Sequence, residues 1–311
     1  MKPIVILAIA FCFTQSVHAQ RPNPTTQALS QMEEMMRQYA DAIVNAEETS
    51  DRAIADSIFT KMLVQALKTP YSFSYAFDSL TTVSHLYAPD SSFRIFTWQV
   101  MKDFTYYRQK GAIQFRTNDG SLKLIPLFDA SPFTEAPTDS VRNNQQWIGA
   151  VYYNIILKTY NNKKYYTLFG YDENDARSTK KWMEVLTFDE NNRPVFGGRY
   201  FNYPNDDTKP PQPAYRYCIE FKKEANAKLN YDPELDLVTF AKLQSETGEP
   251  TLHHTLIPTG SYEGFKWAGG KWVYQPVVRE VDPRSNINPP QPGAERRGDK
   301  PLPLPAKKGK G

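Results

Sequence analysis

The stretch from Lys163 to Gly198 constrains the fold of this chain more strongly than any other part of the sequence. It contains two apolar runs, Tyr165 to Tyr171 and Trp182 to Phe188, which are rich in aromatic and β-branched residues and are bounded by polar turn segments. This pattern is typical of neighbouring antiparallel strands. A polar turn, Asp189 to Pro194, leads to a third short strand and then to Gly197-Gly198, where the chain can adopt positive φ or another backbone can approach closely. We therefore expect this stretch to form the middle of a large antiparallel sheet.

Two helices are expected before the first strand. In the first, apolar residues recur at spacings of three and four, which places Leu29, Met32, Met36, Tyr39 and Ile43 on one face. The second is expected to start at Ser50 or Asp51, either of which can cap exposed N–H groups. Its apolar face is expected to hold Ile54, Ile58, Met62 and Ala66, and Pro70 lies just beyond its end. We expect the two helices to pack on each other or on the sheet.

From Tyr71 onward the hydrophobic period changes to that of strands. Asn118-Asp119-Gly120 indicates a hairpin, because all three residue types tolerate positive φ. Alternating apolar and polar residues from Tyr215 to Lys222 predict a half-buried strand. The expected strands outside the central stretch are Phe93 to Val100, Ala112 to Thr117, Ser121 to Phe128, Trp147 to Leu157, Tyr215 to Phe221, Ala227 to Tyr231, Leu235 to Phe240, Leu252 to Ile257 and Lys271 to Val278.

These observations predict a mainly β protein, with one large antiparallel sheet or a sandwich, two N-terminal helices and a disordered C-terminal tail. The expected division is a helical segment over residues 20–70, a β-rich domain over residues 71–282 and the tail over residues 283–311. Apolar residues make up 40% of the chain, which is enough for a sizeable core. The tail combines prolines, glycines and basic residues and has little to bury.

The N-terminus indicates export. Lys2 is followed by an apolar run from Ile4 to Phe13 that is too short for a stable membrane-spanning helix, and Val17-His18-Ala19 is similar to a signal-peptidase site. Residues 1–19 are therefore predicted to be a cleavable signal peptide, and the protein to be periplasmic or extracellular. Cleavage would remove Cys12 and leave Cys218 without a partner for an intramolecular disulfide. No later stretch has the length and apolarity of a transmembrane helix.

Charge argues against nucleic-acid binding. The formal net charge is +3, but the tail from Pro283 holds seven basic residues against two acidic ones, so the body is mildly acidic. A nucleic-acid-binding body usually shows the opposite balance. The tail itself could attract anionic surfaces of the cell envelope.

The sequence shows no recognisable catalytic, metal or cofactor motif. His253 and His254 would point to opposite faces of a strand, so they would not readily share one metal ion. Cys218 lies within an alternating strand pattern, which favours a structural thiol over a nucleophile. The acidic segment Asp172 to Asp175 could supply oxygen ligands to calcium, but it lacks the spacing of an EF-hand, and turn formation explains it better. We expect no catalytic residue, metal or cofactor.

Aromatic residues close to the end of the body leave two interpretations open. Tyr262, Trp267 and Trp272 could form an exposed platform that binds a sugar or a partner protein. They could instead fill the core of a β protein, where Trp and Tyr are common. The expected partners are accordingly an envelope protein or a glycan.

Several segments of the body form a recognisable set. They are Ser92 to Ile95 with Trp98, Trp147 to Tyr153, Tyr165 to Gly197, Gly260 to Phe265 and Gly270 to Trp272. In these segments the chain resembles a family of exported proteins from Bacteroidota to which no activity is assigned. The resemblance covers roughly residues 71 to 277 and implies export and a shared β-rich fold, but it implies no activity.

Three functional hypotheses follow, because the sequence has no recognisable catalytic motif but has many aromatic residues and a charged tail. The first is an exported, non-catalytic binding or assembly protein of the cell envelope. The second is a secreted hydrolase acting on glycan or peptide, whose carboxylates meet only in the fold. The third is a glycan-binding module that uses the C-terminal aromatic residues.

Overall fold

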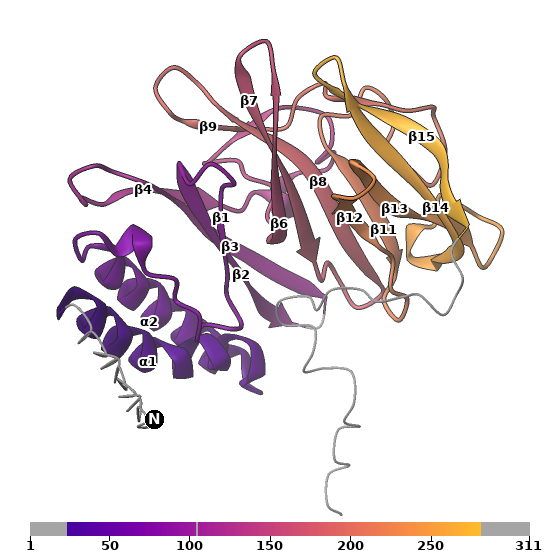
Figure 1. Cartoon of the computed structure of the whole chain (residues 1–311). Helices are drawn as coiled ribbons and strands as arrows, with labels where there is room; N and C mark the ends of the chain where they lie inside the picture. Colours follow the sequence, from indigo (N-terminus) through magenta and orange to yellow (C-terminus); the bar gives the residue numbers. More distant parts are fainter. Residues whose placement is uncertain (1–23, 104, 281–311) are drawn as a thin grey trace, which may run out of the picture.

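The computed structural model describes residues 24–103 and 105–280. It confirms the predicted fold class: the chain is mainly β, with several antiparallel sheets and two helices near the N-terminus (Figure 1). The helices are α1 (Pro24–Asn45) and α2 (Thr49–Leu67). The predicted signal peptide and the predicted tail lie outside the described residues.

The described strands form three sheets, so neither one large sheet nor a simple two-sheet sandwich describes the molecule. All strand pairs are antiparallel except β10 with β15. The first sheet contains β1 (Ser84–Tyr87), β2 (Phe93–Asp103), β3 (Tyr106–Phe115) and β4 (Lys123–Phe128). The second contains β5 (Arg142–Asn143), β6 (Val151–Tyr160), β7 (Lys163–Asp172), β8 (Ser178–Phe188), β9 (Pro194–Phe196) and β11 (Tyr217–Lys222). The third contains β10 (Phe201–Asn202), β12 (Leu229–Asp232), β13 (Leu237–Ser245), β14 (Leu256–Ala268) and β15 (Lys271–Glu280).

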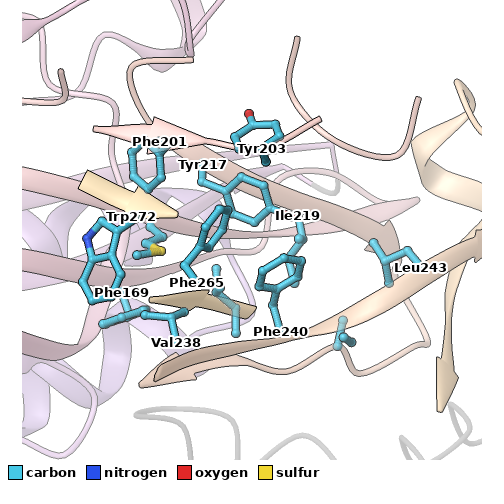
Figure 2. Packing of buried hydrophobic residues seen from close by; sticks show 14 of the residues in the cluster. Phe169, Phe201, Tyr203, Tyr217, Ile219, Val238, Phe240, Leu243, Phe265 and Trp272 are labelled. Carbon is cyan, nitrogen blue, oxygen red and sulfur yellow. The ribbon is translucent and has the colours of Figure 1, made fainter. Parts of the chain in front are cut away.

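Three apolar clusters join the helices and sheets into four successive layers, as Figure 1 shows from α1 and α2 at one side to β14 and β15 at the other. The helices pack on the first sheet, where Phe59 meets Trp98 edge-to-face at 5.2 Å. A second cluster fills the space between the first and second sheets. The third lies between the second and third sheets and is mainly aromatic; Figure 2 shows Tyr217 and Phe265 at its centre, 4.9 Å apart.

Strand β8 explains how the second sheet serves two cores. Successive side chains of a strand point to opposite faces. Trp182 and Leu186 therefore belong to the cluster shared with the first sheet, whereas Met183 and Val185 belong to the cluster shared with the third. Both faces are covered, which is why the sequence from Trp182 to Phe188 is almost continuously apolar.

Helix α2 differs from its predicted orientation. Its buried apolar residues are Ala55, Phe59, Leu63, Ala66 and Leu67, while Ile54 is 58% exposed. The predicted face began one residue too early. Most of this helix is apolar, so two neighbouring stripes satisfy the helical spacing equally well. The predicted capping by Ser50 or Asp51 is also wrong, because the helix begins at Thr49 after Glu48 and without a side-chain cap.

Some predicted strand boundaries move as well. The segment predicted as a strand from Leu252 to Ile257 is a 3-10 turn, η3 (His253–Thr255), which leads into β14. Trp147 and Ile148 are buried, but they precede β6 instead of belonging to it. At Gly197 the prediction is confirmed: φ is 83°, and a Cβ atom there would lie 2.8 Å from the carbonyl oxygen of Tyr215.

A buried ion pair crosses from β8 to the segment before β11. Arg216 Nε lies 3.2 Å from Glu184 Oε2, and both side chains are almost completely inaccessible. Glu184 also accepts a hydrogen bond from the hydroxyl of Tyr152, which in turn accepts one from Trp147 Nε1 at 2.7 Å. The remaining donors of Arg216 reach main-chain carbonyls, including that of Pro137. A buried charge pair is tolerated only when such additional hydrogen bonds satisfy it.

We predict that Arg216→Met destabilises the fold by about 3–5 kcal/mol, because it leaves Glu184 buried without its partner charge. The double variant Arg216→Met, Glu184→Leu should lose less than the sum of the two single changes. Urea unfolding of the purified variants measures both. Arg193→Met, which breaks an exposed pair with Asp189, serves as the control and should cost less than about 1 kcal/mol. Equal losses for Arg216→Met and this control would contradict the prediction.

Candidate functional site

A pocket of about 380 Å³ opens where the second sheet extends past two surface loops. Its floor is formed by side chains of β8 and β11. One wall is the segment from Glu135 to Thr138, and the other is the segment from Thr208 to Pro211. The full lining is Glu135, Ala136, Pro137, Thr138, Lys180, Trp182, Thr208, Lys209, Pro210, Pro211, Cys218, Glu220 and His253.

A row of charged side chains crosses this face of the second sheet. Asp172 on β7 is the direct partner of Lys180 on β8, and Lys180 is the direct partner of Glu220 on β11. His253 of η3 extends the row, with Nδ1 3.7 Å from Glu220 Oε2. Charges of opposite sign therefore alternate across the sheet, which is the favourable cross-strand arrangement.

Exposure is lowest at one end of the row, Asp172, and highest at the other, His253. Asp172 is 8% exposed, whereas the side chains of Lys180, Glu220 and His253 are 23%, 21% and 40% exposed. Asp172 lies beneath the first sheet, where Gln109 Nε2 donates to its Oδ1 at 2.9 Å. The first sheet thus covers one end of the row, and the pocket opens at the other.

Mutual pairing shifts the pKa values of Lys180, Glu220 and His253. Burial lowers the pKa of Lys180, but the carboxylate of Glu220, whose Oε2 lies 3.6 Å from Lys180 Nζ, more than compensates and the net shift is upward. Burial raises the pKa of Glu220, yet His253, Lys180 and Ser178 together hold it at about 2. The carboxylate of Glu220 raises the pKa of His253 above its ordinary value, against the opposing effect of burial.

The two remaining floor residues, Trp182 and Cys218, are cross-strand partners. Burial raises the pKa of the Cys218 thiol well above its ordinary value, so it stays protonated and is a poor nucleophile. Trp182 is 4% exposed, and its indole Nε1 has no hydrogen-bond partner among the described residues.

Buried ion pairs anchor both walls. Arg216, held by Glu184, donates to the carbonyl oxygen of Pro137, and the nearby Tyr215 N–H donates to Thr138 O at 2.8 Å. On the opposite wall, Lys209 is buried and its Nζ lies 3.0 Å from Glu263 Oε2 on β14. The pocket is therefore framed by loops that are fixed to the sheets behind them.

The three aromatic residues singled out from the sequence lie elsewhere, around the third sheet. Trp272 is fully buried and donates from Nε1 to Thr167 Oγ1 at 3.1 Å, so it presents no ring face to solvent. Trp267 is partly buried and meets Trp272 edge-to-face at 5.2 Å. Tyr262 is partly exposed, with Lys228 Nζ 5.8 Å from its ring centroid. A binding surface at Tyr262 and Trp267 stays a prediction.

Sequence reasoning did not select Lys180, Glu220 or His253 as a group. They come from two strands and a turn that are distant in the chain, and only the pairing of β8 with β11 brings them together. A partial signal was present, because the alternation around Tyr217 placed Cys218 and Glu220 on one strand face. It did not show which lysine would lie opposite them.

A second pocket, of about 540 Å³, lies between α1 and the segment from Tyr75 to Ser79. Its buried carboxylate, Glu33, accepts hydrogen bonds from Tyr75 Oη at 2.5 Å and from Ser79 N at 2.7 Å. Burial together with Glu33 raises the pKa of Tyr75 to about 12. These groups satisfy one another and connect the helix to the chain that leads into the first sheet.

The described part of the chain contains no group of three or more His, Cys, Asp or Glu side chains arranged to hold a metal ion. Within the same residues, neither helix has the length and apolarity to cross a membrane. Comparison of the chain with protein-family models, with curated proteins and with solved structures gave no match.

We predict that the buried Asp172 makes stability depend on pH. Burial raises its pKa from 3.8 to about 6 in the folded protein. The folded state therefore binds the proton more tightly than the unfolded state, and stability falls as pH rises from about 4 to about 6, by up to about 3 kcal/mol. Asp172→Asn should remove this loss, so that the free energy of unfolding of the variant rises relative to that of the wild type between about pH 4 and pH 6.

The free energy of unfolding between pH 3.5 and pH 8 measures this effect. Asp207→Asn, which removes one exposed carboxylate, is the control. Parallel pH profiles for the wild type and Asp172→Asn would contradict the assignment.

The contact between His253 and Glu220 predicts a second titration. In the wild type, NMR should place the pKa of His253 above 6.5. Glu220→Gln should lower it, because the hydrogen bond and the charge of Glu220 are lost while burial and Lys180 continue to lower the pKa. Since the folded-state pKa is the raised one, the pair stabilises the fold at low pH, and this contribution is lost as pH rises through that pKa. The signal of His254 gives an internal reference. An unchanged His253 titration in Glu220→Gln would rule out the contact.

Proposed function

We propose that this protein is exported to the cell envelope and acts there as a non-catalytic binding protein. Its ligand site is the pocket of about 380 Å³ whose walls contain Pro137, Pro210 and Pro211. Export rests on Lys2, on the apolar run that follows it and on the cleavage signal before Gln20. The site rests on the pocket itself, which combines apolar walls with a few convergent polar groups, as ligand sites usually do.

The observation that carries a binding role is the mutual pairing of the pocket charges. Lys180 contacts Glu220, and Glu220 contacts His253. A general base or nucleophile needs a group that is free to change protonation near the working pH. Here Lys180 is held cationic, Glu220 is held anionic, and the thiol of Cys218 is held protonated. His253 has a raised pKa and can still titrate, but its Nδ1 faces the Glu220 carboxylate and its Nε2 faces the carbonyl oxygen of Asp207. Groups that are paired in this way can recognise a ligand, but they are poorly placed to react with it.

The framing of the pocket supports the same role. Buried ion pairs at Arg216 and Lys209 fix the two walls to different sheets. A site that is already in its binding geometry loses less entropy when its ligand arrives. The ligand is either a small molecule of the envelope or an exposed end of an envelope protein or glycan.

We predict that the protein extracted gently from its own envelope carries a ligand or partner that depends on the pocket. Native mass spectrometry should show an added mass on the wild type, and N-terminal sequencing should begin at Gln20. Ala136→Trp should lose the added mass, because Ala136 is exposed at the rim and an indole there would obstruct the opening.

Glu190→Trp places the same indole on an exposed turn outside the pocket lining and is the control. A wild-type protein without any bound species, or equal retention by Ala136→Trp and the wild type, would count against the pocket as the binding site.

A further inference from the structure

The pocket floor presents one fixed positive and one fixed negative charge side by side. Lys180 Nζ and Glu220 Oε2 are 3.6 Å apart, and each side chain keeps about a fifth of its surface accessible. At that separation the pair is a loose contact, and each partner retains hydrogen-bonding capacity toward the pocket. The floor therefore offers recognition of both signs of charge within one small volume.

Lys180 supplies the free hydrogen-bond donors of this pair. It uses one N–H on Asn174 Oδ1 at 2.9 Å, which leaves further donors for a ligand. Both nitrogens of His253 already have partners, because Nδ1 lies 3.7 Å from Glu220 Oε2 and Nε2 lies 3.3 Å from the carbonyl oxygen of Asp207. An anionic group on a ligand would therefore meet the ammonium group of Lys180.

Acceptors lie beside the donors. Glu220 Oε1 accepts from Ser178 Oγ at 2.5 Å, and Oε2 faces the pocket cations. Glu135 contributes a second carboxylate on the exposed wall. Positive and negative groups in the lining are close to balanced, which disfavours both a polyanion and a polycation.

The walls select for apolar surface. Pro137, Pro210 and Pro211 have no N–H to donate, and Ala136 adds a methyl group beside them. The volume of about 380 Å³ lies near the lower end of small-molecule sites, which span about 300–1,000 Å³. The ligand is therefore small and carries an apolar part next to its charged part.

We propose that the pocket binds a small zwitterion with an apolar side chain, namely a free amino acid or a dipeptide. Its carboxylate would lie against Lys180, its ammonium against Glu220, and its side chain between the proline walls. This inference rests on the proposed binding function and adds the chemical class of the ligand.

Calorimetric titration of the chain from Gln20 to Gly311 tests it with defined probes. Glycyl-L-leucine carries both charges, N-acetylglycyl-L-leucine lacks the ammonium, glycyl-L-leucinamide lacks the carboxylate, and methyl α-D-glucopyranoside is a neutral polyol. Only the first should bind well, and each blocked dipeptide should bind at least about tenfold more weakly, since each loses a charge-assisted hydrogen bond.

Two variants assign each charge to its partner. In Glu220→Gln, glycyl-L-leucine should bind no more tightly than the acetylated probe. In Lys180→Met, it should bind no more tightly than the amide. The control replaces the ion pair of Lys222 and Glu246, which are 2.7 Å apart outside the pocket lining, by Met and Gln, and it should bind as the wild type does. The probe comparison on the wild type stays decisive even where a variant folds poorly.

Equal binding of the three dipeptide probes, or no binding of glycyl-L-leucine, would overturn the zwitterion. Preferential binding of the glucoside that depends on Glu220 would also overturn it, while leaving the pocket as a binding site. Failure of the pocket itself is recognised separately, by equal retention of the native ligand in Ala136→Trp and the wild type.

Discussion

The buried pair of Glu184 and Arg216 is the interaction on which both the core and the candidate site depend. It lies among the side chains that join the first and second sheets, where low polarity makes each charge costly without the other. The hydroxyl of Tyr152 donates a hydrogen bond to one oxygen of the Glu184 carboxylate, and the guanidinium of Arg216 donates one to the carbonyl of Pro137. A core interaction therefore sets the position of a pocket wall, and loosening of the core at this point would alter the site as well.

The opposite wall uses the same device from another sheet. Lys209 enters the margin of the cluster shared with the third sheet, where Glu263 and Asp206 surround its ammonium group. Surface loops are usually the most mobile parts of a domain. Here a long cationic side chain connects each pocket loop to the packed layers. Lys209 extends from one loop to Glu263, and Arg216 extends from the sheet to the carbonyl of Pro137 in the other loop. These contacts fix the two loops to the sheets behind them, as the proposed binding role of the pocket requires.

Much of the fold could be predicted from the sequence, and the errors have identifiable causes. Apolar runs located β7 and β8, because strands covered on both faces carry a strong apolar signal, and alternation located β11. The face of α2 was predicted one residue out of place, since Ile54 and Ala55 both fit an apolar stripe. The number of sheets was not predictable either. An apolar run shows that a strand is covered on both faces, but it does not show what covers it.

The candidate site could not be predicted from sequence patterns, for a related reason. Its charged residues lie on different elements, and their proximity follows from strand register alone. The aromatic signal near the C-terminus was strong but ambiguous, because a molecule with successive packed layers needs many large side chains between them, and Trp272 is one of these.

The site lies at the margin of the core between the first and second sheets. Its charged row runs from Asp172, which is 8% exposed, to His253, whose side chain is 40% exposed. Charges at such a margin are dehydrated enough to be selective and open enough to meet a ligand. A ligand-binding site in this fold is therefore better placed at the margin of a core than at its centre or on the free surface.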